Sequence, residues 1–85
     1  MITLEKGYEL VSKAFPKLTI FRGFRFRDKL VFEIANNDLK DRIGGMTLVE
    51  VLDKNETVVT ADLDEIFNNL QEYKEAQDKQ IVYVN

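Results

Sequence analysis

Apolar residues near the start of the chain recur at the spacing of a helix. They are Leu4, Tyr8, Val11 and Phe15, which follow one another at intervals of four, three and four residues. Residues at these intervals line one face of a helix. Thr3 is a suitable N-cap and Pro16 ends helical backbone, so we expect a helix over residues 4–15.

Two stretches of alternating polarity follow, over residues 18–26 and 30–36. In the first stretch, one side carries Leu18, Ile20, Arg22, Phe24 and Phe26, and the other carries Thr19, Phe21, Gly23, Arg25 and Arg27. In the second stretch, one side carries Leu30, Phe32 and Ile34, and the other carries Val31, Glu33 and Ala35. Alternation is typical of a β-strand, and the polar break at residues 27–29 predicts a hairpin.

The rest of the chain predicts two more strands, a second helix and a short final strand. The strands cover residues 47–53 and 57–61, after a loop over 36–46 with room for one helical turn. Asp62 and Glu65 form a capping box at the start of a helix that runs to about Asp78. Its apolar stripe consists of Leu63, Ile66, Phe67, Leu70 and Tyr73. Residues 81–85 are the last strand.

These elements predict one α+β domain over residues 1–85: an N-terminal helix, a four-stranded antiparallel β-meander, a second helix and a short C-terminal strand. The sheet face that we assign to the core holds Leu18, Ile20, Phe24, Phe26, Leu30, Phe32, Ile34, Leu48 and Leu52. The opposite face holds Phe21, Val31, Ala35, Val49, Val51 and Val58, beside Arg25 and Arg27. This second face is unusually apolar for a wet surface, so either a helix or another molecule covers it.

The small size of the chain favours self-association. A domain of 85 residues has a core that supplies only about 3–5 kcal/mol. The chain has neither cysteine nor histidine, which excludes disulfides and zinc sites built from these residues. No apolar run is long enough to span a membrane, and the N-terminus lacks the apolar region of a signal peptide, so we expect a cytoplasmic protein.

Charge is distributed unevenly along the chain. The net charge is −3, but residues 1–45 hold nine Lys/Arg and six Asp/Glu, whereas residues 46–85 hold three and nine. Either the opposite charges face solvent on separate elements, or the basic and acidic surfaces attract each other within one chain or between chains.

Residues with catalytic or metal-binding chemistry are scarce. Without histidine and cysteine the common catalytic triads are excluded, which leaves pairs of carboxylates. The candidates are Asp62, Asp64, Glu65, Glu72 and Glu75, which fit a helix cap and a solvated helix face better. The stretch from Asp53 to Asp64 partly matches a calcium loop but has Val58 where the turn needs glycine. We therefore expect no catalytic residue, metal or cofactor.

The hairpin contains the sequence Arg-Gly-Phe-Arg-Phe, which resembles half of the octamer of RNA-recognition domains. The match covers Arg22, Gly23, Phe24 and Phe26 and fails at Arg25, Arg27 and Lys29. In that family the octamer lies on the third strand, and its aromatic rings are exposed for base stacking. Single-stranded nucleic-acid binding through Arg22–Lys29 is our alternative function, although an acidic total charge opposes it.

Arg22 needs a partner if it lies among core-facing residues, because an unpaired buried guanidinium is costly. Glu50 is in phase with Leu48 and Leu52 and is the best candidate acid. We expect Arg22 either to pair with Glu50 or to extend its head group into water.

The order of elements, carried by residues 24–34 and 48–59, resembles small bacterial and phage accessory proteins with a cystatin-like or immunity-protein-like outline. The resemblance transfers no functional residue, and it implies protein–protein interaction rather than catalysis. We therefore predict a non-enzymatic interaction module, either a homodimer or a small oligomeric accessory protein. The predicted interface consists of Phe21, Arg25, Arg27, Val31, Val49 and Val51.

Overall fold

The computed structural model describes residues 1–35 and 47–83. The elements are α1 (Leu4–Ala14), β1 (Thr19–Phe26), β2 (Lys29–Ala35), β3 (Thr47–Leu52), β4 (Thr57–Thr60), α3 (Leu63–Asn68), α4 (Leu70–Gln77) and β5 (Ile81–Val82). This order confirms the predicted α+β fold, with the second helix divided in two. The loop predicted over residues 36–46 lies outside the described residues.

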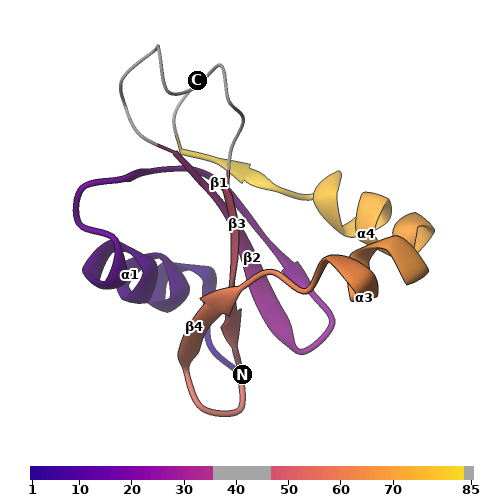
Figure 1. Ribbon diagram of the computed structural model, residues 1–85, viewed down its shortest axis with the longest axis horizontal. Coiled ribbons are helices and arrows are strands. Elements are labelled where there is room, and N and C mark those ends of the chain that lie inside the picture. The colour runs from indigo at the N-terminus through magenta and orange to yellow at the C-terminus, as the bar shows by residue number, and fades with distance from the viewer. Residues whose placement is uncertain (36–46, 84–85) are drawn as a thin grey trace.

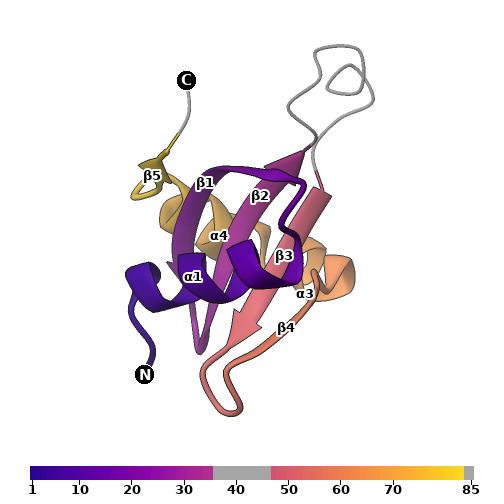
Figure 2. The same ribbon diagram turned by 90° about the vertical axis from the view of Figure 1, so that its left-hand side faces the viewer.

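The five strands form one antiparallel sheet in the order β4-β3-β2-β1-β5. Helix α1 covers one face of this sheet, and α3 and α4 cover the other (Figures 1 and 2). The short strand β5 joins the edge beside β1, where the backbone N–H of Tyr83 donates to the carbonyl of Phe21 at 2.8 Å. The molecule therefore has three layers, and both sheet faces are covered within one chain.

A β-bulge in β1 changes which side chains share a face. Ile20 is paired with Ile34, but the next paired residue, Arg22, lies opposite Glu33. One extra residue reverses the alternation of every side chain that follows it in the strand. Phe24 and Phe26 therefore lie on the face opposite to Ile20, and their predicted assignment to Ile20's face is wrong.

The core consists of two clusters, one on each face of the sheet. The cluster under α1 contains Ile2, Val11, Ile20, Leu30, Phe32, Ile34, Val49 and Val51. The cluster under α3 and α4 contains Phe24, Phe26, Val31, Ile66 and Tyr73, with Leu48 packed against it. Val49 lies opposite Phe32 and Val51 opposite Leu30, so both share the face of Leu30 and Phe32 rather than that of Val31. Leu48 was assigned to the wrong face for the same reason.

The helix caps follow the sequence with one difference. The hydroxyl of Thr3 accepts a hydrogen bond from the N–H of Lys6 at 3.1 Å, and the carboxylate of Asp62 accepts from the N–H of Glu65 at 3.2 Å. The Glu65 side chain does not return this bond, because it lies 2.9 Å from the ammonium of Lys29. The N–H of Asp62 instead donates to Glu50 at 3.4 Å. The capping box is therefore half formed.

Candidate functional site

The basic residues of the β1–β2 hairpin are engaged in ion pairs within the chain. Arg25 lies 2.8 Å from a carboxylate oxygen of Asp53 and also donates to the carbonyl of Ile2. The hydrogen bond from Arg25 lowers the pKa of Asp53, and a further bond from the N–H of Ile2 adds to this effect against the opposing effect of burial. The pair therefore ties Ile2, in the segment that precedes α1, to Asp53 at the end of β3.

Arg27 and Lys29 hold the helix pair on the sheet. Arg27 donates to the carboxylate of Glu72 and, at 2.9 Å, to the side-chain oxygen of Asn69. The hydrogen bond with Glu72 raises the pKa of Arg27. The ammonium of Lys29 lies 3.1 Å from Glu50 and 2.9 Å from Glu65. Burial acts to lower the pKa of Lys29, but the bonds and charges of these two carboxylates outweigh it and raise the pKa.

These pairs decide between the two interpretations of the uneven charge. Arg25, Arg27 and Lys29 come from the basic half of the chain, and all the acids that they contact come from the acidic half. The attraction between the halves therefore acts within one chain.

Arg22 does not pair with Glu50. Its guanidinium lies 3.9 Å from Glu33, its neighbour across the β1–β2 ladder, and the side chain is partly exposed. Glu50 is buried and pairs with Lys29 instead. The alternative expectation, a head group that reaches water, describes Arg22 better.

The aromatic residues of the hairpin lie in the interior. Phe21, Phe24 and Phe26 are all buried, and the ring of Tyr73 packs edge-on against both Phe24 and Phe26 with centroids 5.3 Å apart. Base stacking requires exposed ring faces. The residues on which the nucleic-acid alternative rested are therefore occupied by packing and by ion pairs.

The predicted interface residues do not form an open face of the sheet. Phe21, Val31, Val49 and Val51 are buried within a single chain, so they form no open apolar face. Arg25 and Arg27 reach the surface in part, but both are bound to acids of the same chain. The sequence predicted that either a helix or another molecule covers this face, and in the structure the helices cover these side chains.

An exposed apolar surface lies instead on the outer side of α3 and α4. Leu63, Phe67 and Leu70 are 53%, 68% and 42% exposed. We call these three residues the α3–α4 stripe. The sequence pattern groups them with Ile66 and Tyr73, but only Ile66 and Tyr73 are buried against the sheet. The helix pair therefore has more apolar surface than its own sheet covers.

The α3–α4 stripe has acidic surroundings. The segment from Asp62 to Asp78 holds six carboxylates and one lysine. Four of the five candidate catalytic acids have a structural partner: Asp62 caps α3, Glu65 and Glu72 are in the ion pairs above, and Glu75 accepts from Gln71 at 3.2 Å. Asp64 is exposed. These acids therefore make the surface of α3 and α4 acidic and do not form a catalytic pair.

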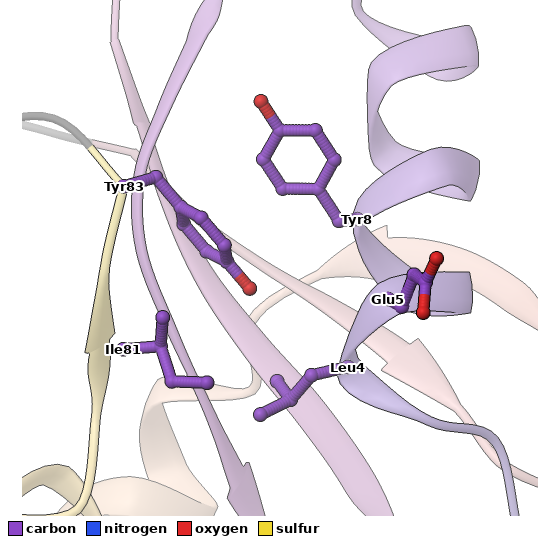
Figure 3. Close-up of a pocket in the computed structure, with 5 residues that line it drawn as sticks. All are labelled: Leu4, Glu5, Tyr8, Ile81 and Tyr83. Carbon is purple, nitrogen blue, oxygen red and sulfur yellow. The ribbon is translucent and has the colours of Figure 1, made fainter.

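A shallow groove of about 360 Å³ lies between α1 and β5. Figure 3 shows its lining residues, which are Leu4, Glu5, Tyr8, Ile81 and Tyr83. The two tyrosine rings have centroids 4.7 Å apart, and burial, with the nearby Tyr8, raises the pKa of Tyr83. The groove is apolar except for one carboxylate, Glu5, so it lacks the two convergent acids that carboxylate catalysis needs.

The predicted partial calcium loop, from Asp53 to Asp64, is a turn, the strand β4 and the start of α3. Asp53 at its start is bound by Arg25, and Asp62 near its end caps α3. Within residues 1–35 and 47–83, no group of three or more acidic side chains is arranged to hold a metal ion. Over the same residues, none of the helices has the length and apolar character needed to cross a bilayer.

The apolar pattern alone does not reveal the α3–α4 stripe as an exposed surface. Five apolar positions over eleven residues are the usual number for a helix that faces a core, and the pattern does not show that the helix breaks at Asn69. Comparison of the chain with protein-family models, with curated proteins and with solved structures finds no match to any of them.

Proposed function

We propose that this protein is a non-enzymatic interaction module that binds another protein through the α3–α4 stripe. The observation that carries the proposal is the exposure of Phe67, at 68%, between two exposed leucines on the same helix pair. Contiguous exposed apolar side chains mark interaction sites far more often than single ones do. Aromatic residues at the centre of such a surface are the usual anchors of protein interfaces.

The fold does not require these three side chains to be apolar. Ile66 and Tyr73 already anchor the helix pair to the sheet, and Arg27 and Lys29 bind its polar side. Full burial of a side chain of this kind is worth roughly 1.5–3 kcal/mol. Leu63 and Leu70 realise part of this gain within the chain, and the rest is available only when another molecule covers the stripe, which supports binding as the reason for its apolar composition.

One feature of the sequence-based expectation changes in this proposal, and one stays. The predicted homodimer rested on an open sheet face, and that face is covered, so the proposed contact moves to the helices. The cytoplasmic location remains part of the proposal, because a chain without cysteine needs no oxidising compartment.

A substitution on the stripe and a matched control test the proposal. Phe67→Ser removes the central ring, and Ile81→Ser removes an exposed apolar side chain, 45% exposed, on the other side of the sheet. Wild type and both variants serve as bait in the cells that express the protein, and each retained protein is then purified and mixed with the purified chain. We expect one protein that binds wild type and the Ile81 variant at least about tenfold more tightly than the Phe67 variant.

Two results contradict the proposal. Equal binding by all three chains would show that the stripe is not the contact. A loss of more than about 2 kcal/mol of unfolding free energy in the Phe67 variant would show that this residue is structural, since surface substitutions normally change stability by about 0.5 kcal/mol or less.

A further inference from the structure

The charge around the α3–α4 stripe distinguishes one class of partner from another. Of the six carboxylates between Asp62 and Asp78, Glu65 and Glu72 are neutralised by Arg27 and Lys29. Asp64, Glu75 and Asp78 have no described cation within ion-pair distance, and Asp64 and Glu75 are exposed. Lys74 is the single cation of the segment. The uncompensated charge beside the stripe is therefore negative.

This charge disfavours a second copy of the chain as the partner. Two copies that met through the stripe about a two-fold axis would bring the acidic surroundings of both stripes into one interface. Like charges brought together at an interface repel each other and suppress association. A partner with the opposite charge gains attraction from the same acids.

The shape of the stripe indicates how such a partner binds. Leu63 and Phe67 are four residues apart on α3 and so form a short apolar ridge on one face of that helix, and Leu70 begins α4 after the break at Asn69. A second helix packs on such a ridge by placing its own apolar side chains beside it. A helix of 14 residues is about 21 Å long, which is longer than the six-residue α3 that carries this ridge.

We infer that the α3–α4 stripe binds a basic amphipathic helix of another protein. Apolar residues of that helix cover Leu63, Phe67 and Leu70, and lysines or arginines on its flanks pair with Asp64 and Glu75. This inference rests on the proposed function and adds the charge and the secondary structure of the partner.

Synthetic peptides test the inference without knowledge of the natural partner. One probe is a 14-residue peptide of leucine and lysine with helical apolar spacing, and the other is the same peptide with glutamate in place of lysine. Calorimetric titration at about 50 mM salt and again at about 500 mM salt compares them, because salt screens exposed charges. We expect the lysine peptide to bind at least about tenfold more tightly than the glutamate peptide at low salt.

Variants assign the binding to the stripe. Phe67→Ser should lower the affinity for the lysine peptide at least about tenfold. Asp64→Asn with Glu75→Gln should lower this affinity about threefold to tenfold. Glu5→Gln with Glu9→Gln removes two exposed acids from α1 and should leave its affinity unchanged. Circular dichroism melts confirm that each variant is folded before it is titrated.

Each other outcome overturns the inference in a recognisable way. Equal binding of both peptides, lost with Phe67→Ser, would keep the stripe as an interaction surface but refute the basic partner. Binding whose affinity is unchanged by Phe67→Ser would be general charge attraction that does not involve the stripe, and it would refute the inference. Absence of binding by either peptide would refute the helical partner and leave the proposed function to its own capture experiment.

Discussion

At the scale of single residues, the most consequential group is the ammonium of Lys29. It is 4% exposed and bonded to Glu50, which is 3% exposed, and to the more accessible Glu65. Removal of one partner of a buried pair leaves the other charge uncompensated. We predict that Lys29→Met lowers the free energy of unfolding by about 3–5 kcal/mol, as measured by urea denaturation.

The matched control for this prediction removes both charges. Lys29→Met with Glu50→Leu leaves no buried charge unpaired, and Glu65 retains contact with solvent and with Arg27. We expect the double variant to recover most of the loss, since apolar replacements of buried pairs are often neutral. A loss below about 1 kcal/mol in the single variant would mean that Glu50 is hydrated there.

Tyr73 gives the molecule a dependence on alkaline pH. Its burial, with the charges of Glu33 and Glu50, raises its pKa from 10.0 to about 12. The hydroxyl of Tyr73 therefore loses its proton more easily in the unfolded chain than in the folded one. The protonated hydroxyl contributes its full stability to the fold below pH 10, and this contribution declines as the pH rises towards 12. We predict that the wild type loses about 1 kcal/mol more stability between pH 8 and pH 11 than Tyr73→Phe does, as measured by urea denaturation. An identical loss in both chains would refute the assignment.

At the scale of elements, what could be predicted from the sequence depended on local signals. Thr3 and Asp62 marked the starts of their helices, because a cap is made by residues a few positions apart. The bulge between Ile20 and Arg22 had no such mark. It could not be inferred from alternation, since an extra residue in a strand looks the same in sequence as a regular one. The faces of Phe24 and Phe26 were wrong for this reason.

The strand β3 shows a second limit. The run from Leu48 to Leu52 has apolar residues on both faces, so its own pattern fixes no orientation. Its faces are set by pairing with β2, which places Val49 opposite Phe32. The interface predicted from the wrong orientation of β3 was therefore wrong as well. The exposed stripe on α3 and α4 depends on how much of each helix the sheet covers, and this is a property of the tertiary structure.

Helix α1 shows how packing overrides propensity. Alanine at Gly7 would stabilise an isolated helix by up to about 1 kcal/mol. In the structure, however, an added Cβ would lie 2.5 Å from a methyl carbon of Leu30 and 3.0 Å from the ring of Phe32. Overpacking of a core costs about 1–3 kcal/mol. We predict that Gly7→Ala lowers the unfolding free energy by about 1 kcal/mol in denaturation experiments, and a gain in stability would show that α1 can move away from the sheet.

At the scale of the whole molecule, the basic and acidic halves of the chain are joined by the ion pairs of Arg25, Arg27 and Lys29. They connect the hairpin to the end of β3 and to both helices of the opposite layer. These pairs neutralise part of the charge asymmetry inside one chain, and the exposed charges of α3 and α4 are mainly acidic. Under the proposed function, this acidic face is the one that an external partner covers, and its charge disfavours a second copy of the chain.

We therefore predict that the chain sediments as a monomer of 9.9 kDa at high micromolar concentration and low salt. Both sheet faces are covered, and the acids beside the α3–α4 stripe repel a second copy. Screening by high salt should permit at most weak association, and Phe67→Ser should abolish it. A tight dimer at low salt that Phe67→Ser dissociates would make the second copy the partner of the stripe, whereas a dimer insensitive to this substitution would place self-association on a different surface. Phe21→Asp tests whether Phe21 is a core residue or an interface residue. A buried charge at this position should unfold the monomer rather than change its association.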